Sequence, residues 1–305
     1  MGLLSDVLAG REAREFASVD EFWAWHVEDV RALPRPVDRA IAGGAAADRL
    51  GYAFTAGYAA ALQALVPGLG PSTLASLAAT EEEGVHPRAI RTELLRREGG
   101  WRLSGRKRFV TLAGSELLVL ARQGEKPDGR ADLVLVRLDR GRPGIRVSPL
   151  PALPFVPEIP HAEIAFEEVP VNPAEVMPGD GWEKWVKPFR TVEDIHVHAA
   201  TLGYLLSLGA RYGWERALRE RLAATLVALR ALAAADPSSA GVHVALAGAL
   251  AGSKQVLDEL EPAWASVPAA VRERWERDRP LLHVAEKARA AREERAWQRI
   301  AEHHS

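Results

Sequence analysis

The chain has 305 residues, of which 48% are hydrophobic and 26% are charged, and its formal net charge is -2. This composition is typical of globular proteins and argues against a disordered or fibrous chain. A net charge this close to zero gives no reason to expect nucleic acid as a partner. The lack of cysteine excludes disulfides, a thiolate nucleophile and cysteine-based metal sites.

No run of about 18 apolar residues occurs, so we expect no membrane-spanning helix. Asp6 and the charged residues after it interrupt the N-terminal apolar stretch before it could form the core of a signal peptide. We therefore expect a cytoplasmic protein.

The first part of the chain has the pattern of helices. Ser18-Val19-Asp20-Glu21 is a capping-box pattern, and apolar residues then recur at helical spacing until Pro34 and Pro36. A second helical pattern covers residues 37–65. We expect the Gly43-Gly44 pair to break it into two helices.

Between Thr80 and Val176 the period of the apolar residues changes from 3.6 to 2, which is typical of strands. The predicted strands are Ile90–Arg97, Trp101–Val110, Leu117–Arg122, Leu133–Leu138, Ile145–Ser148 and Ala162–Phe166. Short strands separated by such turns predict an antiparallel β-sandwich or barrel.

Helical periodicity returns after Gly181. The predicted helices are Thr191–Arg211, Trp214–Ala235, Val242–Leu260 and Leu281–Ile300, and four helices of this length favour a bundle. In the third of them, we expect Gly248 and Gly252 to permit close helix packing. The order α, β, α predicts an α+β fold with a helical N-terminal domain (1–78), a β middle domain (79–180) and a C-terminal helical bundle (181–305).

Several short motifs resemble, in order and spacing, those of the acyl-CoA dehydrogenase family. Thr80-Glu81 stands where the family has Thr-Glu-Pro, and Phe109-Val110-Thr111 matches an aromatic-Ile-Thr segment. Further matches are Trp101, Leu103, Gly105 and Lys107 in a turn motif, Ala165–Val171, and Gly179-Asp180-Gly181-Trp182 before the bundle. The resemblance covers roughly residues 79–260 and implies a divergent, C-terminally shortened member of the family.

The resemblance implies FAD as cofactor, and an acyl-CoA or another acyl thioester as substrate. The hydroxyls of Thr80 and Thr111 would bond the flavin ring, and Phe109, next to Val110, would stack on one of its faces. A planar amphipathic ring needs this combination of apolar cover and a few fixed polar contacts. The residues alone leave a second interpretation open, in which these are ordinary strand threonines and a core phenylalanine. By analogy with the family, we expect a homodimer or homotetramer.

The family's reaction needs a carboxylate that removes the α proton while a hydride leaves the β carbon. Most members place this Glu in a Glu-Gly turn after an Arg-Asp pair, but no Glu-Gly follows Arg277-Asp278. A minority place it early in the first bundle helix, before a Leu-Gly, and Glu193 falls in that register before Leu202-Gly203. The alternative is that Glu193 only favours a helix start, since Thr191-x-x-Asp194 is itself a capping-box pattern.

Three departures from the family pattern bear on the reaction. Glu82 replaces the Pro of Thr-Glu-Pro, Gly84-Val85-His86 replaces a Gly-Ser-Asp that contacts the acyl-CoA, and an Arg-x-x-Phe-Gly that holds the flavin pyrophosphate is absent. Binding of FAD, of FMN or of neither therefore stays open. Three functions remain: a dehydrogenase, a non-catalytic subunit or binding module, and a flavin monooxygenase, which needs no carboxylate base.

Glu193 and His196 have the spacing of one di-iron helix pair, but a di-iron bundle needs a second pair. His196 and His198 point to different faces of a helix, which disfavours a shared metal. We therefore predict no metal site.

Ser104-x-x-Lys107 has the spacing of a serine–lysine nucleophile, but we place it in a turn and do not assign that chemistry. Lys107 also belongs to a run of basic residues with Arg102, Arg106 and Arg108. This run is either a patch that contacts phosphates or a solvated turn.

Overall fold

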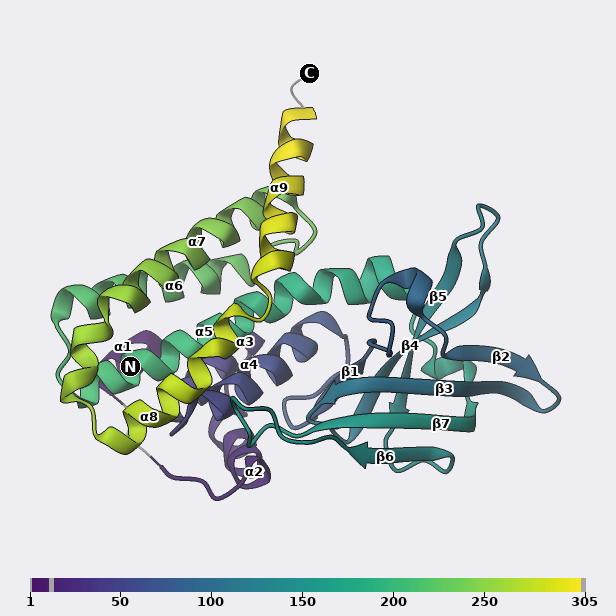
Figure 1. The fold of residues 1–305 in the computed structure, drawn as a ribbon, viewed down its shortest axis with the longest axis horizontal. Helices are drawn as coiled ribbons and strands as arrows, with labels where there is room; N and C mark the ends of the chain where they lie inside the picture. The colour runs from purple at the N-terminus through teal and green to yellow at the C-terminus, as the bar shows by residue number, and fades with distance from the viewer. Residues whose placement is uncertain (1, 11–13, 303–305) are drawn as a thin grey trace. The chain divides into compact units, whose positions relative to one another are not determined.

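The computed structural model describes residues 2–10 and 14–302, and the chain forms two compact units (Figure 1). The helical unit contains the chain up to Ala64, the short segment Leu153–Glu158 and the chain from Thr191 onward. The sheet unit contains Leu65–Ala152 and Ile159–Arg190. Helices from both ends of the sequence thus pack into one unit.

The α-helices of the described residues are α1 (Leu3–Ala9), α2 (Val19–Val30), α3 (Pro36–Ala46), α4 (Leu50–Leu65), α5 (Lys187–Arg211), α6 (Arg216–Leu232), α7 (Ala240–Glu259), α8 (Ala269–Asp278) and α9 (Glu286–Glu302). Short helical turns lie between them: η1 (Pro87–Ala89), η2 (Pro173–Glu175), η3 (Gly181–Val186), η4 (Glu261–Ser266) and η5 (Arg279–His283). None of the described helices is long and apolar enough to cross a membrane.

The predicted N-cap of α2 is confirmed. The Ser18 hydroxyl accepts a hydrogen bond from the Glu21 backbone N–H at 3.1 Å. The Glu21 carboxylate in turn accepts from the Ala17 N–H at 2.8 Å, one residue before the position that a regular capping box uses.

The expected helix break at Gly43-Gly44 is wrong, because both glycines lie inside α3. A Cβ on Gly44 would lie 1.9 Å from the carbonyl oxygen of Ala200 on α5. A Cβ on Gly57 of α4 would lie 2.6 Å from the Cα of Val197, also on α5. The glycines are therefore needed where α3 and α4 touch the backbone of α5.

The expectation for Gly248 and Gly252 on α7 is also wrong. A Cβ built at either position would have no heavy atom of another part of the described chain within 4 Å. These two glycines therefore do not create a close helix contact.

This contrast gives a paired prediction on stability. Gly44→Ala should lower the free energy of unfolding by about 1–3 kcal/mol, because the α5 backbone must shift to admit the methyl group. Gly248→Ala should raise it by about 0.5–1 kcal/mol, because alanine favours an open helix position. Urea unfolding followed by circular dichroism measures both values, and equal effects at the two sites would contradict the packing described here.

The sheet unit contains β1 (Ala75–Ala78), β2 (Glu93–Arg97), β3 (Gly100–Thr111), β4 (Glu116–Glu125), β5 (Ala131–Asp139), β6 (Ile145–Pro149) and β7 (His161–Val171). The strands form one sheet in the order β1-β4-β2-β3-β7-β6, with β5 paired to β4. The strand β4 pairs antiparallel with β5 along one edge. Along its other edge it pairs in parallel, first with β1 and then with β2.

The expected α+β class is confirmed, while the sheet is mixed instead of purely antiparallel. β1 was not predicted, because its Ala-Ser-Leu-Ala contains no β-branched or aromatic residue. The segment expected as a turn around Ser104 lies within β3, and the hairpin turn precedes it at Gly99, where φ is +85°.

Candidate functional site

A buried ion pair fixes the loop that follows β1. The Lys107 side chain is fully buried, and its Nζ lies 2.6 Å from Glu81 Oε1 and 3.3 Å from the Ala79 carbonyl oxygen. The Glu81 carboxylate also accepts hydrogen bonds from the backbone N–H groups of Arg91 and Thr92, at 2.8 and 3.0 Å. One carboxylate therefore joins three segments that are distant in sequence.

Burial lowers the pKa of Lys107 to about 8, although Glu81 acts in the opposite direction. Burial alone would raise the pKa of Glu81, but Lys107 and the backbone donors outweigh it and leave this pKa below its ordinary value. Because Lys107 is buried, the expectation that it belongs to an exposed basic run is wrong. Of that run, Arg106 and Arg108 approach the Glu163 carboxylate at 3.5 and 3.8 Å.

Thr80 lies directly before this ion pair and is joined to β3. The Arg108 backbone N–H donates a hydrogen bond to the Thr80 carbonyl oxygen at 2.9 Å. The Thr80 side chain is half-buried, and no hydrogen bond to its hydroxyl occurs among residues 2–10 and 14–302. The Thr80 backbone is thus fixed to β3, and the Thr80 hydroxyl is available to hydrogen-bond a bound molecule.

A β-bulge in β3 turns Phe109 outward. The pairing of β3 with β7 shifts register between Lys107 and Val110, and Phe109 between them has a φ of +56°. The Phe109 ring is 54% exposed, while the Val110 side chain is buried in the sheet core. A bulky residue in the left-handed region is rare, and such strain is often found at functional sites. The Arg108 guanidinium lies 5.4 Å from the centre of this ring.

The end of β3 continues along an unusual backbone path. Thr111 is half-buried, and its carbonyl oxygen accepts a hydrogen bond from Ser76 Oγ at 2.7 Å. Leu112 and Ala113 follow with φ values of +65° and +41°. Ser76 Oγ also accepts from the Gly114 N–H at 2.8 Å, so this side chain on β1 holds the strained turn in place.

The structure thus brings Thr80 and Phe109 together through the Arg108 bond, with Thr111 two residues further along β3. An exposed aromatic face next to two hydroxyls is suited to cover and orient a planar polar ring.

Ser104 has no nucleophilic arrangement. Its hydroxyl donates a hydrogen bond to Glu168 Oε1 at 2.7 Å and accepts one from the Glu168 N–H at 3.2 Å. Since Lys107 is buried with Glu81, it cannot activate this hydroxyl.

Glu193 lies on α5 in the helical unit and is half-buried. The alternative in which Thr191 and Asp194 cap a helix is wrong, because α5 already begins at Lys187. The Asp194 carboxylate is instead bound by Arg289 Nε at 2.8 Å and by Arg292 Nη2 at 2.7 Å. Glu193 therefore has no role in starting the helix.

His196 and His198 are buried on α5 and neutral. Each donates its Nδ1–H to a carbonyl oxygen one turn earlier, that of Val192 at 2.7 Å and that of Asp194 at 2.8 Å. Burial lowers the pKa of both imidazoles to about 4. The described part of the chain contains no group of three or more metal-ligating His, Asp or Glu side chains.

These two histidines predict how stability depends on pH. Between pH 6.5 and about 4 the unfolded chain binds protons that the buried imidazoles do not, so the free energy of unfolding should fall as the pH falls. At pH 5 the loss should be about 1–2 kcal/mol for each histidine. Urea unfolding at pH 7 and pH 5 measures it, and a His196→Asn/His198→Gln variant should show a weaker dependence. An equal dependence in that variant would contradict the assignment.

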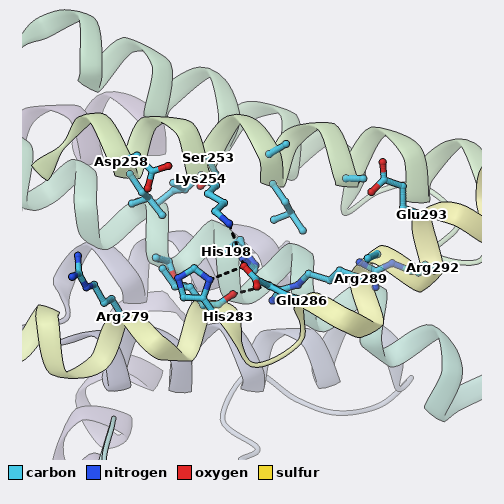
Figure 2. Close-up of a pocket in the computed structure, with 18 of the residues that line it drawn as sticks. His198, Ser253, Lys254, Asp258, Arg279, His283, Glu286, Arg289, Arg292 and Glu293 are labelled. Carbon is cyan, nitrogen blue, oxygen red and sulfur yellow. Dashed lines mark hydrogen bonds and ion pairs between the residues drawn. The ribbon is translucent and has the colours of Figure 1, made fainter.

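Sequence reasoning missed a cavity of the helical unit (Figure 2). Three charged or titratable side chains from different elements line it: Lys254 on α7, His283 on η5 and Glu286 on α9. Glu286 Oε1 lies 2.7 Å from His283 Nδ1 and 3.4 Å from Lys254 Nζ. No local motif marks these residues, because each comes from a different element.

We compared the chain with protein-family models, curated sequences and solved structures. Residues 76–169 match the middle domain of acyl-CoA dehydrogenases. Butyryl-CoA dehydrogenase from Megasphaera elsdenii is 16% identical, with a TM-score of 0.65 over 92% of this chain and 89% of that chain. FMN-bound TdsC from Paenibacillus sp. A11-2 is 14% identical, with a TM-score of 0.65 over 88% and 83%. PigA with FAD and proline is 14% identical, with a TM-score of 0.63 over 93% and 90%. A comparison with curated sequences found no match.

At these identities the structural similarity establishes the fold, which is that of acyl-CoA dehydrogenases. The middle-domain match and this fold together confirm the resemblance. Residues 76–169 therefore resemble the acyl-CoA dehydrogenase middle domain, and the chain has the acyl-CoA dehydrogenase fold.

Proposed function

We propose that this protein is a flavin-dependent oxidoreductase that introduces a double bond between the α and β carbons of an acyl thioester. The observation that supports it best is Phe109, an exposed aromatic ring held in a strained backbone conformation, with the Thr80 backbone bonded to Arg108 and Thr111 two residues further along β3. The ring is exposed while Val110 next to it is buried, which leaves the ring available to a bound molecule.

The residues present fit a flavin ring. The Phe109 face supplies apolar cover, and the Thr80 and Thr111 hydroxyls supply polar contacts that orient the ring. Val110 is buried and would contribute through its backbone. We propose FAD as the flavin, as in the solved PigA complex, although TdsC holds FMN.

When bound, the flavin supplies a hydride acceptor for the β carbon of the substrate. Glu193 supplies the base: its carboxylate takes the proton from the α carbon, and the electron pair of that C–H bond becomes the new double bond as the hydride leaves. We assign the proton transfer to Glu193 because it stands in the sequence register of the base in part of the family, early in the first bundle helix and before Leu202-Gly203.

The same proposal includes a cytoplasmic enzyme that assembles as a homodimer or homotetramer, in line with its family. Two alternatives remain as outcomes of the tests. A non-catalytic relative would bind no flavin or fail to reduce it with acyl-CoA. A monooxygenase would consume oxygen when supplied with reduced flavin.

Flavin binding is tested with the purified protein and its absorbance spectrum. We expect a stoichiometric flavin spectrum, with FAD released on denaturation. Phe109→Ala should weaken flavin binding by about 10- to 100-fold, because stacking on an aromatic side chain contributes about 1–3 kcal/mol where it has been measured on nucleic bases. Trp297→Ala is the matched control, since this ring on α9 is 52% exposed and should not affect flavin binding. A colourless protein that does not bind added FAD or FMN would contradict the proposal.

A further inference from the structure

The cavity of the helical unit has the size of a small-molecule site. Its volume is about 340 Å³, and helices α5, α7 and α9 enclose it with η5 (Figure 2). Its apolar lining consists mainly of Leu202, Leu250, Leu257, Leu282 and Trp275. Sites for small ligands commonly occupy about 300–1,000 Å³ and combine an apolar wall with a few polar groups. None of the residues that we assign to the flavin or to proton transfer lines this cavity.

The wall of the cavity contains a hydrogen-bond acceptor without a donor. His198 is 8% exposed, and its Nδ1–H is used by the Asp194 carbonyl oxygen. The imidazole is neutral, so its Nε2 carries a lone pair. No hydrogen bond to Nε2 occurs in the described part of the chain, although His198 lines the cavity. Because His198 lines the cavity, a ligand hydroxyl can donate a hydrogen bond to this nitrogen.

One end of the cavity has an excess of buried positive charge. Arg289 and Arg292 both line it, and in the described part of the chain both bind the single carboxylate of Asp194, so two guanidinium groups share one carboxylate. Both arginines are largely buried, at 19% and 14% exposure. The carboxylates of Asp258 and Glu293 also line the cavity, but they are exposed, and solvent screens exposed charges.

The other charged side chains of the lining are already paired. The pairs are Arg279 with Glu261 at 3.3 Å and Lys254 with Glu286 at 3.4 Å. The net attraction for an anion is therefore strongest at Arg289 and Arg292, which Figure 2 shows together at one end of the cavity.

We propose that this cavity binds a small amphipathic organic acid that carries a hydroxyl group. The carboxylate of the ligand lies at Arg289 and Arg292, its hydroxyl donates to His198 Nε2, and its hydrocarbon chain covers the leucines. Each of these three parts of the ligand contacts one feature of the cavity. The site is separate from the proposed flavin site and does not require that the protein be an enzyme.

Calorimetric titration of the purified full-length chain with three probes tests the proposal. The probes are 3-hydroxyoctanoate, which has both the anion and the donor, octanoate, which lacks the hydroxyl, and methyl 3-hydroxyoctanoate, which lacks the charge. We expect 3-hydroxyoctanoate to bind about tenfold more tightly than octanoate, as one hydrogen bond contributes, and at least tenfold more tightly than the ester.

Two variants locate the site. Leu250→Trp fills the cavity from α7 and should abolish binding of all three probes. His198→Leu keeps the volume but removes the acceptor, so the tenfold preference for 3-hydroxyoctanoate over octanoate should disappear. This second readout is a ratio of two affinities and does not depend on a small loss of stability.

Three results would overturn the proposal. They are the absence of binding of any probe at millimolar concentration, binding that Leu250→Trp leaves intact, and a hydroxyl preference that persists in His198→Leu. Because no readout uses flavin or turnover, a failure here is distinguishable from a failure of the proposed oxidoreductase activity.

Discussion

Glu193→Gln is expected to slow the reduction of bound flavin by an acyl-CoA by about 10²–10⁴-fold while the flavin stays bound. The amide has nearly the shape of the carboxylate but cannot accept the α proton, and general base catalysis contributes about this factor. Glu193 is half-buried on a helix whose other carboxylate, Asp194, is held by two arginines. Anaerobic stopped-flow recording of the flavin absorbance measures the rate.

The matched control for this variant is Glu183→Gln on η3. Glu183 forms an exposed ion pair with Lys187, with side-chain exposures of 55% and 62%, and its loss should leave the reduction rate within about twofold. If Glu193→Gln reduces its flavin as fast as the unmodified protein, another group is the base. If neither protein reduces flavin with any acyl-CoA, the chain is not a dehydrogenase of this type.

Lys107→Met should lower the free energy of unfolding by about 3–5 kcal/mol. This substitution removes the cation of a buried ion pair and leaves the buried Glu81 carboxylate without its positive partner. Because Glu81 also holds the backbone of Arg91 and Thr92, the loop that carries Thr80 should loosen. Urea unfolding gives the stability, and hydrogen exchange of residues 79–92 gives the local effect.

Two further variants test whether the loss of stability comes from the unpaired buried charge. Glu81→Gln/Lys107→Met has no buried charge and should be more stable than Lys107→Met alone. Lys187→Met breaks only the exposed pair with Glu183 and should change stability by less than about 1 kcal/mol. A loss in Lys107→Met no larger than that in Lys187→Met would show that the buried pair does not stabilise the protein.

The sequence predicted most of the regular elements, since each one buries one face of a periodic pattern. β7 follows this rule, and so do α2 and α7. The prediction from sequence failed where a contact with a residue distant in sequence determines the local structure. The local propensity of Gly43-Gly44 predicts a helix break, but Gly44 lies against the α5 backbone at Ala200 and Gly43 against the side chains of His26 and Ala56, so both positions require small residues inside the helix.

The order of family motifs selects the residues that we propose to face the flavin, but it does not predict their geometry. The outward turn of Phe109 depends on a register shift against β7, some fifty residues later in the chain. In the same way, the burial of Lys107 depends on Glu81, on the other side of a loop. The cavity at His198 requires three helices to meet and leaves no trace in any single stretch of sequence.

The backbone at Phe109 has a consequence for engineering and for evolution. A left-handed conformation at a phenylalanine costs about 1–3 kcal/mol, and glycine adopts it without that cost. Selection for stability alone would therefore replace Phe109 with glycine and remove the ring. If Phe109 binds the flavin as we propose, random libraries selected separately for heat resistance and for flavin binding should diverge at residue 109.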